Sequence, residues 1–491
     1  MIYVLCIHIT MIFEPKQFNR SVQFIFSSGY KNNHKSLLTL LKRTRYPILK
    51  KSNFYLAIVQ LGIIDAVVEI QESISELNKE KAKSIENKTD TAHIDRALRN
   101  NKEILRIIYT ISDGIVARAF KFDRPILRVM SENKQFGHLQ KDTIDHVGVL
   151  KNVLKSLSRN GLCIVNDITR YLRIGDVSVI RKGGNITLYE VKTKAETGKT
   201  RLIDVGQILT NIIENKNFPN KQNQRHIIAQ MAIITRRISI PEKVDSPKQP
   251  YKEKFGVDII DLPIRIRHYM VEVGRALKAS KKQIITRLNL EEGYSISILR
   301  CDQLTPENAR SVYDDFNREP KWFDRESEYM FRVTNIQSFI TEENEFPRNI
   351  LPYSVFPFDA DDCLKLMSGE IYIAVFFDLR KLEKKLKISG WEVKDGEVIK
   401  ELRSKEPYQN MERNGLDMFG RTEPSVFHLS KETKHGRYRC SIPATQLLSA
   451  MFSFYTSDFL VDIVNEQLSI SEPRKGGYVT YNFIDEQNIY K

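Results

Sequence analysis

The chain has 491 residues, 41% of them hydrophobic, and a formal net charge of +15 at pH 7. The apolar fraction excludes an intrinsically disordered protein, and the length allows two or three domains. The positive charge favours an anionic partner such as nucleic acid, although solubility alone can also account for it. The five cysteines include no Cys-x-x-Cys pair, which argues against a zinc finger and indicates a reducing compartment.

The first 13 residues are apolar but too short to span a bilayer. They also lack the basic start and the small-residue cleavage site of a signal peptide. We interpret them as a buried strand or as residues upstream of the true start. No later segment combines transmembrane length with an absence of charge. The sequence therefore predicts a cytoplasmic protein with no membrane partner.

Residues 1–140 are predicted to form a mainly helical, basic region. Segment 15–64 contains nine Lys or Arg and no Asp or Glu, a pattern that fits contact with phosphates or simply a solvated basic face. The spacing of apolar residues predicts a helix over 63–83. The polar residues 86–91 end this helix and cap a second one over 92 to about 119, so a helical hairpin is expected.

Residues 141–290 are predicted to form a separate domain of α/β class. A helix is expected over 142–158 and a strand over 162–168. A hairpin follows over 174–193, and an amphipathic helix is expected over 202–215. The resulting order is helix, strand, strand, strand, helix.

The predicted hairpin carries charges that a core strand normally excludes. Residues 181–185, Arg-Lys-Gly-Gly-Asn, suit a tight reversal between two runs rich in β-branched residues. Because side chains alternate faces along a strand, Asp176 can share one face with Glu190 and Lys192. Buried charges must be paired or bound to a metal. The cluster therefore indicates either a cross-strand ion pair or a divalent cation site.

Asp176, followed on the neighbouring strand by Glu190-Val191-Lys192, resembles the PD-(D/E)xK nuclease superfamily, which has the restriction-endonuclease-like fold. The resemblance covers about residues 142–235. Gly175 and Gln207 also resemble a variant of the family's pattern, in which a Gln lies on the helix after the sheet. It implies a restriction-endonuclease-like core of helix, strand, strand, strand and helix.

Two features depart from the family's pattern. No Pro precedes Asp176. The helix before the sheet often supplies an additional Glu, but residues 147–158 contain none, and Asp145 is a weak substitute.

The resemblance also implies roles for the individual residues. Asp176 and Glu190 would hold one or two Mg²⁺ ions, with Mn²⁺ as an alternative, and the carbonyl of Val191 would be a further ligand. Lys192 would orient the attacking water or stabilise charge on the phosphate. Gln207 would support the site or touch substrate. We therefore predict a metal-dependent nuclease, acting on DNA in preference to RNA.

Two other functions fit the same residues. The chain could be a nucleic-acid-binding protein without catalysis on the same fold, or a scaffold subunit of a larger assembly. The intact Asp, Glu and Lys favour the enzyme over both alternatives.

The nuclease interpretation makes two geometric predictions. The carboxylates of Asp176 and Glu190 should converge to about 4–6 Å, a distance that one cation can bridge. Gln207 should face the same pocket as Lys192, with Ile208 and Ile212 packed on the sheet.

A second match to the bare pattern tests its specificity. Asp378 precedes Glu392-Val393-Lys394 by the same number of residues as Asp176 precedes Glu190. The residues between them have a helical pattern, so the acids cannot lie on adjacent strands. We therefore predict no site there.

A proline-containing linker or surface loop is expected over 239–256. Beyond it, residues 257–267 are predicted to add a strand to the same sheet, and residues 271–288 to form a basic helix. Residues 291–491 are predicted to form an α+β domain of unassigned role. Such a domain could contact a protein partner or a second copy of the chain.

The strands and helices expected in this C-terminal region are as follows. Strands are predicted over 294–300, 329–336, 353–358 and 371–379, and helices over 378–387 and 444–467.

Overall fold

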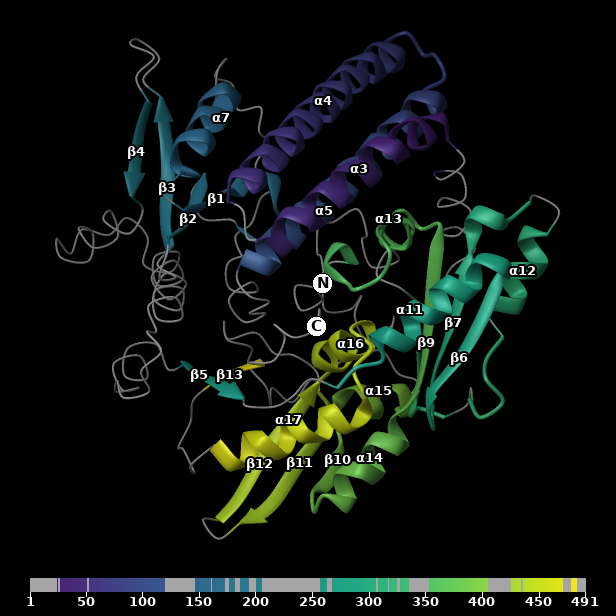
Figure 1. The fold of residues 1–491 in the computed structure, drawn as a ribbon. Coiled ribbons are helices and arrows are strands. Elements are labelled where there is room, and N and C mark those ends of the chain that lie inside the picture. Colours follow the sequence, from purple (N-terminus) through teal and green to yellow (C-terminus); the bar gives the residue numbers. More distant parts are fainter. Residues whose placement is uncertain are drawn as a thin grey trace. The chain divides into compact units, whose positions relative to one another are not determined.

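The computed structural model describes the following residues: 24, 27–50, 53–119, 146–159, 161–172, 176–181, 186–193, 200–204, 257–262, 267–305, 308–316, 318–324, 327–334, 353–404, 425–433, 436–470 and 478–483. The chain divides into two compact units (Figure 1). We call residues 26–247 with 351–355 the N-terminal unit, and residues 248–350 with 356–491 and 1–25 the C-terminal unit. This division differs from the predicted boundaries at 140 and 290, and residue 290 falls inside a strand, β6 (Ile285–Glu291).

Three helices open the N-terminal unit: α3 (Ser28–Lys50), α4 (Asn53–Glu86) and α5 (Ala92–Ala119). The predicted helical hairpin is confirmed, because α4 and α5 pack along each other (Figure 1). The Asp90 carboxylate accepts a hydrogen bond from the Ala92 amide at 2.9 Å and so caps α5. Helix α4 was predicted to begin at Ile63, but it begins ten residues earlier, at Asn53. The apolar spacing extends back through Leu56 and Val59, which are buried.

By length and composition, residues 54–86 of α4 could cross a membrane, and 44% of the most apolar window is buried inside the protein. That burial comes from packing of α4 against α3, α5 and the sheet. Cytoplasmic localisation stays a prediction.

A four-stranded antiparallel sheet follows α7 (His146–Leu157) in the N-terminal unit. Its strands lie in chain order: β1 (Gly161–Val165), β2 (Val177–Arg181), β3 (Ile186–Thr193) and β4 (Thr200–Asp204). The predicted strand over 162–168 ends at Val165, because residues 166–168 form a 3₁₀ turn. The predicted hairpin is confirmed, with Val177 opposite Tyr189 and Ile180 opposite Ile186.

The helix predicted to begin at Leu202 is wrong over its first residues. Thr200–Asp204 is strand β4, which pairs with β3 so that Leu202 lies opposite Val191. Pairing satisfies backbone groups that an edge strand would leave to solvent. The remainder of that predicted helix, including Gln207, Ile208 and Ile212, lies outside the described residues.

The free edge of β1 is covered by α4. Gln60 on α4 is fully buried, its Nε2 donates to the Cys163 carbonyl at 2.8 Å, and its Oε1 accepts from the Val165 amide at 3.0 Å. One side chain therefore makes the two hydrogen bonds that another strand would otherwise make.

The described residues of the C-terminal unit form three sheets. The first has the order β6-β7-β9-β8, the second β10-β11-β12, and the third pairs β5 with β13 in parallel. Their strands are β5 (Val257–Leu262), β6, β7 (Tyr294–Arg300), β8 (Met330–Thr334), β9 (Ile371–Asp378), β10 (Glu392–Asp395), β11 (Ser425–Thr433), β12 (Gly436–Pro443) and β13 (Tyr478–Phe483). The helices are α11 (Met270–Ala279), α12 (Ala309–Phe316), α13 (Ala360–Ser368), α14 (Leu379–Ile388), α15 (Glu397–Ser404), α16 (Ala444–Phe452) and α17 (Ser457–Ile470).

Two predictions about the start of this unit are corrected. The strand at 257–262 pairs with β13 and not with the sheet β1-β2-β3-β4. The helix predicted over 271–288 ends at Ala279, because residues 285–291 pair with β7.

Two further predictions nearer the C-terminus are also wrong. Residues 353–355 form a 3₁₀ turn where a strand was expected. The helix predicted over 444–467 is two helices, α16 and α17. It breaks where Phe454 takes a φ of 55° and its carbonyl accepts from the Tyr269 amide at 2.7 Å.

Two helical glycines should respond oppositely to alanine. Gly62 on α4 is exposed and has no atom near an added Cβ, so Gly62→Ala should stabilise the protein by about 1 kcal/mol. Gly114 on α5 faces Ser354, whose hydroxyl donates to the Thr110 carbonyl at 2.8 Å. An added Cβ would clash with that hydroxyl, so Gly114→Ala should cost about 1–3 kcal/mol. Urea unfolding of both variants measures the difference, and equal effects would contradict this packing.

Candidate functional site

Asp176 lies directly before β2 and is held by backbone contacts on both sides. Its carbonyl accepts from the Asn166 amide at 2.8 Å, and its amide donates to the Tyr189 carbonyl at 2.8 Å. Its side chain is buried, and Oδ2 accepts from the Val191 amide at 2.6 Å. The carboxylate is therefore fixed beside residues 189–191, the segment that contains Glu190.

The hairpin brings the sequence-predicted residues to one end of the sheet. Glu190, Val191 and Lys192 lie on β3, an inner strand between β2 and β4. The side chains of Glu190 and Lys192 lie outside the described residues, so the separation of about 4–6 Å between the carboxylates stays a prediction. Val191 is buried, and its backbone is tied to Asp176.

A second polar pair lies next to Asp176 and was not predicted. Asn166 follows β1, and its Oδ1 accepts from the Ser178 hydroxyl at 2.8 Å. Both residues are buried. This pair links the loop after β1 to β2, and it fixes the backbone that positions Asp176. Only the position of Asn166 at a strand end could have drawn attention to it.

A buried ion pair joins the same loop to α5. The Asp113 carboxylate is fully buried and accepts from Arg170 Nε at 2.6 Å, from the Arg170 amide at 2.7 Å and from Thr169 Oγ1 at 2.7 Å. Arg170 also donates to Thr110 Oγ1 at 2.9 Å. These bonds fix residues 169 and 170, which lie between β1 and Asp176, against α5.

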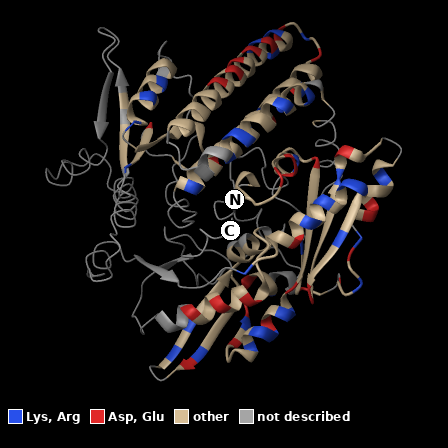
Figure 2. Cartoon of the chain, in the orientation of Figure 1, with Lys and Arg blue, Asp and Glu red and all other residues tan. Residues whose placement is uncertain are grey.

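The basic N-terminal segment folds in part as α3, which contains no acidic residue (Figure 2). Lys31, Lys35 and Lys42 are exposed on this helix. Positions 31, 35 and 42 fall on one helical stripe. An exposed cationic stripe fits both interpretations, a phosphate contact and a solvated face.

The second match to the sequence pattern is not a site. Asp378 ends β9, and its Oδ1 accepts from the Arg380 amide at 3.0 Å, so it caps α14. Glu392 lies on β10 in a different sheet and hydrogen-bonds Ser430 Oγ at 2.7 Å. The predicted intervening helix is confirmed, and it separates the two acids.

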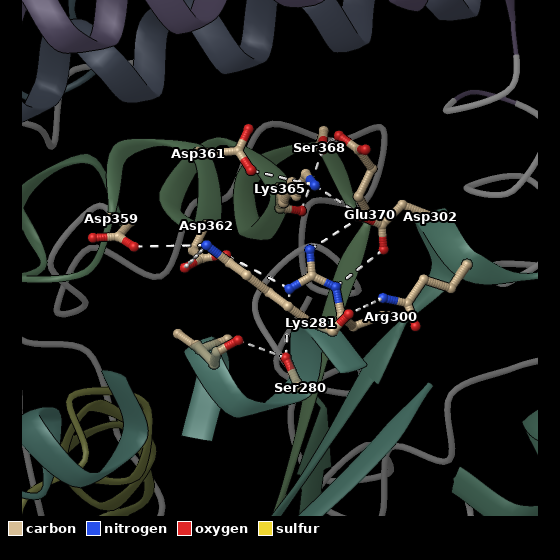
Figure 3. Close-up of polar contacts among 12 residues, drawn as sticks. Ser280, Lys281, Arg300, Asp302, Asp359, Asp361, Asp362, Lys365, Ser368 and Glu370 are labelled. Atoms are coloured by element: carbon tan, nitrogen blue, oxygen red, sulfur yellow. Dashed lines mark hydrogen bonds and ion pairs between the residues drawn. The ribbon is translucent and has the colours of Figure 1, made fainter. Parts of the chain in front are cut away.

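A buried charge cluster in the C-terminal unit was also not predicted (Figure 3). Arg300 is 2% exposed and bonds both carboxylate oxygens of Asp302, at 3.1 and 3.2 Å. Lys365 Nζ lies 2.8 Å from Asp302 Oδ2. Burial opposes the charged form of Asp302, but the hydrogen bonds from Arg300 and Lys365 outweigh it and lower its pKa.

Asp362 completes this cluster at the start of α13. It is almost fully buried, and its Oδ1 lies 3.6 Å from Arg300 Nη1. Burial raises the pKa of Asp362 above its usual value, against the opposing charges of Lys281 and Arg300. The charges are compensated within the cluster, which joins α13 to the ends of β7 and α11 (Figure 3). We assign it a structural role.

Among the described residues, no three His, Cys, Asp or Glu side chains form a group that could hold a metal ion. The side chain of Glu190 does not belong to the described residues. A metal site within the pattern Asp176 and Glu190-Val191-Lys192 would therefore require both Asp176 and Glu190. No family model, curated protein or solved structure matches the chain.

Proposed function

We propose that the chain is a metal-dependent nuclease that hydrolyses phosphodiester bonds in DNA. One observation carries the proposal. The buried carboxylate of Asp176 is fixed by the Val191 amide beside the strand segment Glu190-Val191-Lys192. The antiparallel pairing of β2 with β3 supplies the strand arrangement that this chemistry requires.

The bond from Val191 is compatible with metal binding. An ionised carboxylate has roughly four lone-pair sites, so the hydrogen bond from the Val191 amide to Oδ2 does not by itself preclude a role as metal ligand. The bond also fixes the direction of the carboxylate, as hydrogen bonds to metal ligands generally do. Hard divalent cations such as Mg²⁺ prefer oxygen ligands of this kind.

Each residue then has a defined role. Asp176 and Glu190 would hold the cation, together with the Val191 carbonyl, and the cation would neutralise charge on the scissile phosphate. Lys192 would orient the attacking water or stabilise the developing charge. Gln207 would contact this site from the chain that follows β4. The net charge of +15 and the cationic stripe on α3 support an anionic polymer as substrate.

The test is cleavage of linear and circular DNA by the purified full chain with Mg²⁺, with Mn²⁺ and with EDTA. Cleavage that requires the metal and stops in EDTA is the expected result. Calorimetric titration with Mg²⁺ alone should detect binding that is lost in Asp176→Ala protein. Salt-sensitive DNA binding with no cleavage in either metal would favour a non-catalytic binding protein. Absence of both metal and DNA binding would favour a scaffold subunit.

A further inference from the structure

The sheet β10-β11-β12 carries a serine and a histidine that form a continuous hydrogen-bonded chain with a glutamate on α15. Ser441 Oγ lies 2.9 Å from His428 Nδ1, and His428 Nε2 lies 2.7 Å from Glu397 Oε1. Ser441 is on β12, His428 on β11, and Glu397 is the first residue of α15. A nucleophile, a base and a carboxylate that orients the base are the groups used in nucleophilic catalysis, here with the imidazole reversed relative to the serine-protease triad, so that Nδ1 faces the serine.

The local fold sets this geometry. His428 and Ser441 are directly opposite each other in the antiparallel pair, so their side chains share one face of the sheet. Glu397 reaches them because Gly396 lets the start of α15 approach β11. A Cβ on Gly396 would clash with the Ser425 carbonyl oxygen. The Ser425 amide also donates to Glu397 Oε2 at 2.9 Å, which locks the carboxylate in place.

The hydrogen bonds determine which nitrogen carries the proton. An ionised Glu397 accepts only, so neutral His428 donates through Nε2–H. Nδ1 then accepts a hydrogen bond from the Ser441 hydroxyl. Burial opposes ionisation of Glu397, but the bonds from His428 and the Ser425 amide outweigh it and lower the pKa of Glu397. The carboxylate is therefore ionised at neutral pH, as this tautomer requires.

The face that carries these groups is open to solvent. The His428 side chain is 25% exposed, and Glu392, which lies on the same face, is 46% exposed. A buried structural histidine would instead be closed off from reagents. Ser441 itself is half-buried, so the group of three lies at the surface of the sheet.

We propose that Ser441 is a nucleophile for acyl transfer from carboxylic esters, with His428 as its general base and Glu397 as the positioning residue. The Ser441 oxygen would bond to the ester carbonyl carbon while its proton passes to His428 Nδ1. The alcohol would leave with that proton when the ester C–O bond breaks. Water would then attack the acyl-serine, His428 would take and return its proton, and a carboxylic acid would be released. This activity is independent of the proposed nuclease site.

The test is labelling of the full chain by a biotinylated fluorophosphonate, located by peptide mass spectrometry. The Ser441 oxygen bonds to phosphorus, fluoride leaves, and His428 takes the proton. Wild type should be labelled at Ser441. Ser441→Ala should abolish the label, and His428→Gln should slow it by about 10²–10⁴-fold.

Two further variants separate catalysis from folding. Ser430 lies on β11, the strand of His428, and its hydroxyl bonds Glu392. Ser430→Ala should therefore leave labelling unchanged. Glu397→Gln should slow labelling, whereas Glu397→Asp, which keeps the carboxylate, should retain part of the rate. A folded wild-type protein labelled no faster than Ser441→Ala would overturn the proposal. Asp176→Ala protein should label normally, so failure here is distinct from failure of the nuclease proposal.

Discussion

Asp176→Ala protein should lose metal-dependent DNA cleavage by at least about 10³-fold, since a bound cation supplies several kcal/mol of transition-state stabilisation. Glu190→Ala should have the same effect, because it removes the second carboxylate. DNA binding should persist in both variants, since other Lys and Arg residues supply the non-specific affinity. Gel assays of cleavage and binding, with the metal titrated, measure these effects. EDTA should reproduce the acid variants.

Lys192→Ala distinguishes a role in catalysis from a role in metal binding. It should reduce cleavage by about 10²–10³-fold, as loss of one charge-stabilising group does elsewhere. Metal affinity should remain close to wild type, because an ammonium group is not a metal ligand. Loss of metal binding in this variant would show that Lys192 holds the site together structurally.

The chain supplies its own matched controls for these variants. Glu392 and Lys394 repeat the pattern Glu-Val-Lys on β10, where their side chains pair with each other at 3.2 Å. Glu392→Ala and Lys394→Ala should cleave DNA at the wild-type rate. Wild-type cleavage by Asp176→Ala protein, with contaminating nuclease excluded, would overturn the mechanism.

Arg170→Met should destabilise the protein by about 3–5 kcal/mol, because it leaves the charge of Asp113 buried without its cation. Asp113 has no exposed surface, and its bonds from Thr169 and the Arg170 amide cannot replace the guanidinium. Urea or thermal unfolding monitored by circular dichroism measures the loss.

A surface pair provides the comparison. Lys81 and Asp95 are 2.7 Å apart, with about a third of each side chain exposed. Lys81→Met should therefore cost less than about 1 kcal/mol. The double variant Asp113→Leu, Arg170→Met should recover part of the loss, since an apolar pair needs no compensating charge. Equal effects of Arg170→Met and Lys81→Met would show that the buried pair contributes no more than a surface pair.

Local signals predicted some elements well. Helix α5 begins at the predicted Ala92 because Asp90 supplies the cap that the sequence indicated. The hairpin of β2 and β3 was predicted because a Gly-Gly pair lies between two β-branched runs. Strand β4 was missed, since its apolar residues also fit the start of a helix. Only pairing with β3 decides between the two, and pairing is not local.

Local sequence signals also predict only part of the polar sites. The position of Asp176 on the hairpin followed from local spacing, and its bond to the Val191 amide follows from the strand pairing. The Asp113–Arg170 pair and the series from Ser441 to Glu397 join residues distant in the chain, with no characteristic spacing. The spacing of the histidines matches no motif, so no local signal indicates a role for His428. The register of β11 with β12 brings it to Ser441.

The contact of Gln60 with β1 limits how this protein can be shortened. A fragment that starts at residue 141 would keep the sheet but remove the side chain that occupies its outer edge. The exposed edge would then be a template for strands of other copies, and the fragment would aggregate during expression. We therefore expect a well-behaved fragment with Asp176 in place to retain α4 together with the sheet β1-β2-β3-β4.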